Sequence, residues 1–498
     1  MKASKRRSPS VRWLPSPRFD PNSVWQSPFA DATRAYASRE MIQLWSNNEK
    51  FATWRLLWYF IAKCQKMVGL KLISQKQIKE MEHHLHDRIN FRKVARIEAE
   101  VEHDVEAHKR AWGIVCPAAA PIMHLGCTSC SIENNASLVV QKKSLQLIVL
   151  GLAKTIHQLA RFAEQWSEAP TTGLTHIQAA QSVTIGKRAA MWLYDLLLDL
   201  REIKRRDEEL PFLGLKGPTG TQADLLKLFD GDARRVLDLE RMLAEELGFS
   251  RALLISGQTY TRKYDMLLIS ALAGIGATAV RITNDLRLLA AFNEMREPRK
   301  SGRVSSTGMP WKSNPKDCER VSGMGETLSN LAGLGTSVYK GQAFERTLND
   351  SSALRTALPE AFLAADAVLR LMQKILSGLV VNEEVVIVNL YRHLPFSCMG
   401  EVLTAMVQAG VDRQAAHQRI RDHAMKAYEK LNQGHENDLL VRISEDPYFF
   451  PVHNKLDEMT RPDIGLSALQ VQNFLANEVA PALEPYQGSL EVTVNVDF

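Results

Sequence analysis

Two long stretches without proline, residues 122–169 and 219–297, constrain the fold of this chain more than any other feature. From Ile148 onward, apolar side chains in the first stretch recur at steps of three or four residues: Leu152, Ile156, Leu159, Ala163 and Trp166. This spacing places them on one face of an α-helix, so the stretch predicts a long helix packed in a bundle.

Small residues are frequent in the second stretch and in a third that follows Pro315. The second contains the segment Ala271–Ala277, and the third contains Gly323, Gly325, Ala332, Gly333 and Gly335. Small side chains allow helices to approach closely, although each glycine inside a helix costs about 1 kcal/mol. We therefore expect an all-α fold with a central elongated helix bundle. Its partly apolar outer faces indicate that it forms the core of a tetramer, although periodicity alone leaves a solitary bundle open.

The expected organisation is a tail followed by three helical domains. Residues 1–28 are basic and rich in proline and serine, and we expect them to be disordered. Residues 29–128 form the first domain, 129–381 the long-helix bundle, and 382–498 a C-terminal domain of shorter helices. Prolines break those shorter helices, and the alternating residues near the chain end allow a short strand. These prolines are Pro395, Pro447, Pro451 and Pro462, and the alternating residues are Val492, Val494, Val496 and Phe498.

Composition excludes several classes of protein. The chain has 498 residues, 45% hydrophobic and 24% charged, with a net charge of +6 that is small for this length. A dedicated nucleic-acid binder is therefore not expected, whereas an anionic small substrate is compatible. No uninterrupted apolar run reaches the roughly 18 residues needed to cross a bilayer, so we expect no membrane association.

The cysteines and the N-terminus indicate a cytoplasmic protein. Six cysteines in a chain of 498 residues are too sparse for a disulfide framework. Cys127 and Cys130 form a C-x-x-C pair, but no second pair lies nearby to complete a zinc site, and we expect no metal or cofactor. The basic cluster Lys2, Lys5, Arg6 and Arg7 precedes no apolar core, which argues against a signal peptide.

The segment Ser305–Pro315, here called the signature loop, carries the clearest chemistry. It reads Ser-Ser-Thr-Gly-Met-Pro-Trp-Lys-Ser-Asn-Pro and so combines hydroxyls, a cation and an amide beside a glycine. Removing a proton next to a carboxylate needs a positioned base together with positive charge and donors where the enediolate charge develops. Lys312 and Asn314 can supply that charge and those donors.

The signature loop resembles that of the fumarase/aspartase superfamily, whose members release fumarate. Two further segments resemble the adenylosuccinate lyase branch of it: Met123–Cys130, which resembles the carboxylate-binding loop, and Gly173–Gln181, which resembles the general-acid loop. The resemblance covers roughly residues 30 to 485. It implies a C–N lyase of purine biosynthesis that eliminates fumarate from adenylosuccinate to give AMP, and that also cleaves the related succinyl-carboxamide ribotide.

The resemblance also implies catalytic roles. Counting back from Met309 without a gap makes Ser306 the base, whereas an alignment that preserves the Ser-Ser pair selects Ser305; loop length favours Ser306. Lys312 then activates it, because a serine is a poor base at its usual pKa. His176 is the candidate general acid. His103 matches a histidine that orients the substrate, and Asp104 is placed to hold its tautomer.

The residues expected to bind substrate fall into two sets. Hydroxyl and amide groups suit the two carboxylates, and arginines suit the phosphate and purine because a guanidinium fits phosphate geometry. The set for the succinyl end is Thr128, Ser129, Thr175, Gln222 and Asn314. The set for the nucleotide end is Tyr36, Arg320, Arg346, Ser351 and Arg355. The resemblance further implies a homotetramer whose active sites are shared between subunits.

Five departures from the family pattern bear on the identity of the substrate. Ala35 separates Arg34 from Tyr36, which are adjacent in the family; Asn134 replaces an aspartate, Leu213 replaces an arginine, and Trp311 and Ser313 alter the signature loop. The elimination machinery remains, so these changes concern the far end of the substrate. A lyase acting on another N-succinyl amine in a specialised pathway therefore stays open, as does an inactive structural homologue.

Overall fold

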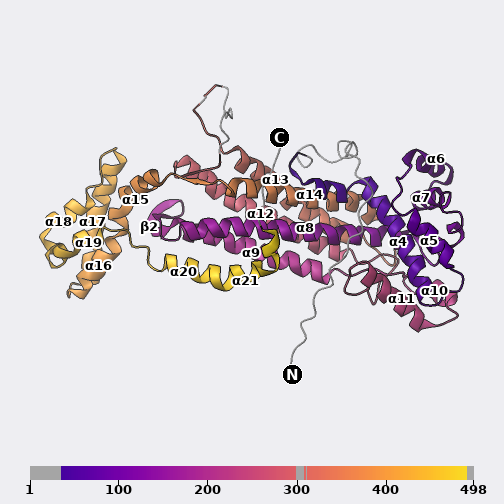
Figure 1. Cartoon of the computed structure of the whole chain (residues 1–498). Helices are drawn as coiled ribbons and strands as arrows, with labels where there is room; N and C mark the ends of the chain where they lie inside the picture. Colours follow the sequence, from indigo (N-terminus) through magenta and orange to yellow (C-terminus); the bar gives the residue numbers. More distant parts are fainter. Residues whose placement is uncertain (1–34, 299–307, 310, 491–498) are drawn as a thin grey trace.

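The computed structural model describes residues 35–298, 308, 309 and 311–490. The molecule is elongated, and five long helices of the described chain run along its length (Figure 1). They are α8 (Ser129–Gln165), α9 (Ile185–Glu209), α12 (Lys263–Ala291), α13 (Lys316–Lys340) and α14 (Asn349–Leu376). The predictions of an all-α fold and of a central elongated bundle are confirmed.

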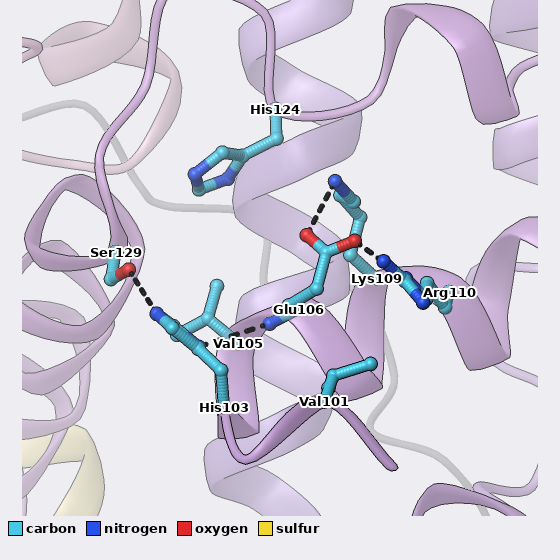
Figure 2. A pocket seen from close by; sticks show the side chains of 8 residues that line it. All are labelled: Val101, His103, Val105, Glu106, Lys109, Arg110, His124 and Ser129. Atoms are coloured by element: carbon cyan, nitrogen blue, oxygen red, sulfur yellow. Dashed lines mark hydrogen bonds and ion pairs between the residues drawn. The ribbon is translucent and has the colours of Figure 1, made fainter. Parts of the chain in front are cut away.

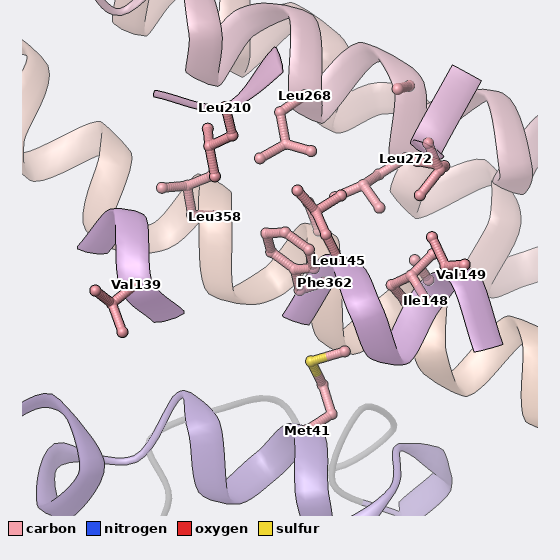
Figure 3. Close-up of a cluster of buried hydrophobic side chains, with 14 of the residues drawn as sticks. Met41, Val139, Leu145, Ile148, Val149, Leu210, Leu268, Leu272, Leu358 and Phe362 are labelled. Atoms are coloured by element: carbon pink, nitrogen blue, oxygen red, sulfur yellow. The ribbon is translucent and has the colours of Figure 1, made fainter. Parts of the chain in front are cut away.

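Helix α8 forms where the apolar periodicity predicts it. Thr128 is its N-cap: the Thr128 hydroxyl accepts from the Ser131 amide, and the Ser131 hydroxyl accepts from the Thr128 amide. The residues of the predicted stripe from Ile148 to Ala163 are fully or almost fully buried. Figure 3 shows part of the resulting core, in which side chains from α3, α8, α12 and α14 meet. Those labelled there include Met41, Leu145, Ile148, Leu268, Leu272, Leu358 and Phe362.

The small residues of α12 and α13 serve the close approach that the sequence predicts. A Cβ on Gly276 would lie 2.7 Å from the carbonyl oxygen of Gly325, and a Cβ on Gly325 would lie 2.7 Å from that of Gly276. Any side chain at either position would therefore force the two backbones apart.

Two of these long helices are apolar enough to cross a membrane by length and composition, namely α8 and α12. In the fold, 61% of the most apolar window of α8 and 50% of that of α12 are buried within the protein. Burial of this kind is typical of core helices in a bundle.

Shorter helices occupy one end of the bundle, next to the N-terminus of α8 (Figure 1). They are α3 (Arg39–Leu44), α4 (Asn47–Met67), α5 (Gln75–His83), α6 (Phe91–Val101), α7 (Asp104–Gly113), the 3₁₀ turn η1 (Ala120–Ile122), α10 (Ala223–Leu228) and α11 (Ala233–Glu246). Trp54, Trp58 and Trp112 are fully buried here, and His108 stacks on Phe51 with ring centroids 3.7 Å apart.

The opposite end carries helices with a hydrophobic cluster of their own. They are α15 (Glu383–Ser397), α16 (Met399–Gln408), α17 (Arg413–Asn432), α18 (Leu439–Glu445), η2 (Pro447–Lys455) and α19 (Leu456–Met459). The prediction that Pro395 breaks a helix is wrong, because Pro395 lies inside α15. The chain then returns along the bundle and packs Val471, Val479 and Leu483 into the main core. That return consists of α20 (Ser467–Phe474), η3 (Leu475–Val479), α21 (Ala480–Leu483) and η4 (Glu484–Ser489).

Short strands, which the helical reading did not predict, form two antiparallel pairs. β1 (Pro170–Thr175) pairs with β2 (Gln178–Thr184), and β3 (Met295–Arg296) pairs with β4 (Val380–Val381). The strand allowed at residues 492–498 lies outside the described residues.

Candidate active site

The N-terminus of α8 gathers the first group of predicted site residues. Thr128 is the N-cap, and Ser129 and Cys130 form the first turn of this 37-residue helix. Unpaired amides and the helix dipole favour an anion at such a terminus. The position therefore suits the predicted binding of a carboxylate by Thr128 and Ser129.

His103 reaches Ser129 from a neighbouring helix, as Figure 2 shows. It is the N-cap of α7, and its Nδ1 accepts from the backbone amide of Glu106 at 3.4 Å. In a neutral ring the proton is then on Nε2, which lies 3.1 Å from Ser129 Oγ and donates to it. Asp104 does not hold this tautomer: its Oδ1 is 3.7 Å from His103 Nδ1 and accepts instead from the Val105 amide at 2.7 Å.

A pocket of about 290 Å³ opens beside this contact. Its charged residues form one cluster, in which Glu106 bonds Lys109 at 2.6 Å and Arg110 at 2.7 Å. On its far wall, burial and then the charge of Lys109 lower the pKa of His124 to about 4, so this ring is neutral at pH 7. The complete lining is Val101, His103, Val105, Glu106, Lys109, Arg110, His124 and Ser129.

Arg346 and Arg355 join the same end of the molecule. Burial raises the pKa of the Glu133 carboxyl on α8, and the charge of Asp104 also raises it. Arg355 and Arg346 both lower this pKa. Burial and then Arg355 lower the pKa of the Lys50 ammonium, so the two cations lie close to each other. Ser351 lies between the arginines in the first turn of α14, and Arg355 is exposed.

Three charged or polar residues near this group were missed by sequence reasoning. Lys50 and Glu133 sit within helices, where a charge ordinarily indicates a solvated face. Gln258 stands in a segment that takes part in the family resemblance, and its Oε1 accepts from Cys130 Sγ at 3.2 Å.

The predicted residue Gln222 is the N-cap of α10 with a left-handed backbone (φ 56°), and its side-chain amide donates to the Leu215 carbonyl at 3.1 Å.

His176 lies on a β-hairpin rather than on an irregular loop. Thr175 pairs with Gln178, so His176 and Ile177 form a two-residue turn, with φ of 54° and 59°. The positive φ of both residues fits a type I′ turn, although a β-branched residue such as Ile177 is unfavourable there. The tip is exposed, and Ile177 keeps 58% of its surface accessible. We refer to residues 170–184 as the His176 hairpin.

The His176 hairpin lies at the opposite end of α8 from Ser129 (Figure 1). Ser129 and Gln165 are separated by about 54 Å along the axis of this helix, at 1.5 Å per residue. The six residues of β1 span only about 20 Å. The connection at residues 166–169 is a tight turn, in which the Ala169 amide donates to the Trp166 carbonyl at 3.3 Å, and it adds at most about 7 Å. Even a hairpin folded straight back along α8 would then leave His176 more than about 20 Å from Ser129. One chain therefore cannot bring these two residues together.

The signature loop is described only in part. Ser305 and Ser306 lie outside the described residues, whereas Lys312 and Asn314 lie within them, and Lys312 is exposed. At the base of the loop, the buried Glu297 carboxylate accepts from the amides of Asp317 and Cys318 at 3.0 to 3.1 Å. Glu297 therefore caps α13 and brings the two ends of the loop together.

Tyr36 and Arg320 meet near this base. The Arg320 guanidinium lies over the Tyr36 ring at 5.6 Å, and it donates to Asp317 at 2.7 Å. Asp317 also pairs with Lys374 at 2.9 Å. Lys374 is 19 residues from Arg355 along α14, or about 28 Å. Within one chain, the Tyr36–Arg320 pair is thus remote from Arg346 and Arg355.

The departures from the family pattern occupy different surroundings. Leu213 is 1% exposed in the main core, and Asn134 is buried with its Oδ1 unbonded to any described residue. Trp311 is 77% exposed, and Ser313 and Ala35 are exposed as well. The arginine that Leu213 replaces would need a buried partner here, because an unpaired buried charge is costly.

Comparison with known proteins identifies the family. Residues 30–328 match the lyase family model, and residues 395–473 match the model of the adenylosuccinate lyase C-terminus. Adenylosuccinate lyase from Saccharomyces cerevisiae is 39% identical over 93% of this chain and 97% of its own length. The enzyme from Schizosaccharomyces pombe is 37% identical over 92% and 96%. The chain belongs to the adenylosuccinate lyase family.

Solved structures with lower identity agree on the fold. Fumarate lyase from Mesorhizobium sp. BNC1 is 21% identical and superposes with a TM-score of 0.78, covering 90% of this chain and 100% of that chain. The 3-carboxy-cis,cis-muconate lactonizing enzyme from Pseudomonas putida is 20% identical, with a TM-score of 0.76 and coverage of 92% and 98%. This adenylosuccinate lyase family member therefore shares its fold with both of these enzymes.

Proposed function

We propose that this protein cleaves adenylosuccinate to fumarate and AMP, and that it also cleaves the related succinyl-carboxamide ribotide. The observation that carries the proposal is the identity of 37–39% with adenylosuccinate lyases over almost the whole length of both chains. The anion-favouring terminus of α8, with His103 and the two arginines beside it, supports an anionic substrate. We place this activity in the cytoplasm.

In this proposal, Ser306 removes a proton from the carbon next to one succinyl carboxylate, with Lys312 and Asn314 stabilising the resulting charge. The C–N bond then breaks, the electron pair leaves with the nitrogen, and His176 donates a proton to that nitrogen. Thr128, Ser129, Thr175 and Gln222 hold the carboxylates. His103, bonded to Ser129, orients the substrate.

The nucleotide end is proposed to bind to arginines. Arg346, Ser351 and Arg355 bind the phosphate, because charge-assisted guanidinium contacts suit a phosphate dianion. Tyr36 and Arg320 contribute from a different copy of the chain. This assignment follows from the separation of about 28 Å between Lys374 and Arg355 along α14.

We further propose that the active protein is a homotetramer with shared sites. A site that needs both His176 and Ser129 requires two chains, since more than about 20 Å separates them in one chain. The exposed Ile177 and Leu174 on the His176 hairpin are apolar, as expected of a tip covered by another subunit.

The departures at Ala35 and Leu213 favour one alternative. Leu213 removes a cation from a position where the family carries arginine, and Ala35 separates Arg34 from Tyr36. Both changes would weaken contacts to the far end of a nucleotide. The alternative is a fumarate-releasing lyase with a different N-succinyl amine as substrate.

Mixing the protein with adenylosuccinate while recording fumarate absorbance tests the proposal, with AMP quantified in parallel. We expect stoichiometric release of both products, and none from the matched His176→Ala variant. Succinyladenosine, which lacks the phosphate, should be a poor substrate. Faster cleavage of succinyladenosine would support the alternative substrate, and the absence of fumarate from any succinyl amine would indicate an inactive homologue.

A further inference from the structure

Arg346 is fixed by a carboxylate that it shares with a second, buried arginine. Asp350 Oδ1 accepts from Arg346 Nη1 at 3.1 Å, while Asp350 Oδ2 accepts from Arg262 Nε. The Asp350 and Arg262 side chains are 1% and 4% exposed, whereas Arg346 is 19% exposed. Each carboxylate oxygen thus holds one guanidinium, and only Arg346 extends toward solvent.

The network continues from Arg262 into the core of the bundle. Arg262 lies 3.6 Å from Asp265, whose Oδ1 accepts from the Tyr260 hydroxyl at 2.8 Å and from the Gln141 amide at 3.3 Å. The Arg262 guanidinium also lies over the Tyr260 ring at 4.5 Å. Contacts to α8 and α12 therefore fix Arg262 from behind.

The charges of this network explain why two arginines are present. A carboxylate paired with Arg346 alone would cancel much of the positive potential that an anion meets at that side chain. The buried charges of Asp350, Arg262 and Asp265 sum to −1, and Arg346 makes the network neutral. Without Arg262, the two carboxylates would leave a net negative charge beside Arg346, so Arg262 preserves the ability of the exposed Arg346 to bind an anion.

The backbone around Arg346 is held in the same way. The Gln342 side chain accepts from the Arg262 amide at 2.9 Å and donates to the Tyr260 carbonyl at 3.0 Å. The backbone amide of Gln258 donates to the Glu345 carbonyl at 3.0 Å. Gly257 permits this approach, because a Cβ there would lie 2.6 Å from the Glu345 oxygen.

We propose that Asp350 and Arg262 are positioning residues that set the direction of the Arg346 guanidinium toward the substrate's phosphate. The inference rests on the proposed function, in which Arg346 is a phosphate ligand. Neither Asp350 nor Arg262 touches substrate in this assignment. Their effect is on how strongly the enzyme distinguishes a phosphorylated substrate from an unphosphorylated one.

The test measures phosphate selectivity, defined as kcat/KM for adenylosuccinate divided by kcat/KM for succinyladenosine. The principal variant is Asp350→Asn, because an amide oxygen can accept from one arginine while its NH₂ group cannot accept from the other. Arg262 keeps Asp265, so this variant leaves no buried charge without a counter-charge. Arg262→Lys, which preserves every charge but loses the guanidinium fork, is the second variant.

A structural control and a direct control accompany these variants. Asp207→Asn breaks the Lys142–Asp207 pair of 3.1 Å between α8 and α9, where Lys142 is about 20 Å along α8 from Ser129. It should lower stability without changing phosphate selectivity. Arg346→Ala removes the proposed ligand itself and should abolish most of the selectivity.

We expect Asp350→Asn to reduce phosphate selectivity by about 10-fold to 100-fold, chiefly through KM for adenylosuccinate, as displacement of a binding group typically does. Arg262→Lys should act in the same direction and less strongly. A purely structural role would lower kcat/KM for both substrates equally and would overturn the inference. Unchanged selectivity in Asp350→Asn beside a loss in Arg346→Ala would also overturn it and leave the proposed function intact. A wild-type protein without phosphate selectivity would overturn both.

Discussion

Mixing two inactive variants tests the shared active site most directly. His103→Ala changes a residue that contacts Ser129 at one end of α8, and His176→Ala changes a residue beyond the other end. More than about 20 Å separates His176 from Ser129 in one chain. Each variant alone should be nearly inactive, because every site then lacks one of the two rings. After dissociation and reassembly at a ratio of one to one, a site is intact when its His103 and its His176 both come from chains that retain them.

Random assembly gives each of these conditions a probability of one half, so about one quarter of the sites should be intact. We therefore expect fumarate release at about 25% of the wild-type rate per site. Tagging one variant with a cleavable affinity peptide, and isolating complexes that contain both chains, shows that mixed oligomers have formed. Mixed oligomers without recovered activity would refute the reasoning, since a site built from a single chain would always contain one of the two defects.

Three further predictions follow from the site and the fold. Ser306→Ala should abolish fumarate release with little change in substrate binding, and Ser305→Ala should be mild; the reverse pattern in steady-state kinetics would assign the base to Ser305. Arg355→Ala should lower kcat/KM for adenylosuccinate by roughly tenfold or more, and a variant equal to wild type would contradict the phosphate assignment. Burial, and then the charge of Arg55, lower the pKa of His108 to about 4, so the folded state favours the neutral ring and loses stability as the pH falls from about 6.5 toward 4. Over this pH range, the free energy of unfolding measured in urea should fall by up to about 3 kcal/mol less for His108→Phe than for wild type. An equal fall in both proteins would exclude His108 as a source of acid sensitivity.

Local patterns in the sequence predicted the long helices well. The stripe from Ile148 to Ala163 depends only on spacing within one helix, and the structure buries it as expected. The same holds for Gly276 and Gly325, whose lack of a side chain indicates close packing even though the sequence does not say which helices meet. Pro395 shows the limit of local rules, since the surrounding helix tolerates it near its end.

The hairpin and the loop base could not be predicted in this way. His176 and Ile177 adopt left-handed conformations that neither residue favours, and no Asn-Gly or Asp-Gly pair marks the turn. Glu297 caps α13 from across the signature loop, a contact fixed only by the completed fold. The clustering of His103 with Ser129 followed from the family resemblance, whereas Lys50 and Glu133 carried no signal that separates them from ordinary helix charges.

The length of α8 has a consequence for how this protein can change. The terminus proposed to bind a carboxylate lies at one end of this helix, and the His176 hairpin follows the other. Inserting a single residue would shift one end relative to the other by about 1.5 Å and rotate it by about 100°. In the proposed tetramer these ends serve different active sites, so such an insertion would disturb the alignment of several sites at once. We therefore expect the protein to tolerate insertions and deletions in connections such as residues 433–438, between α17 and α18, and not within α8.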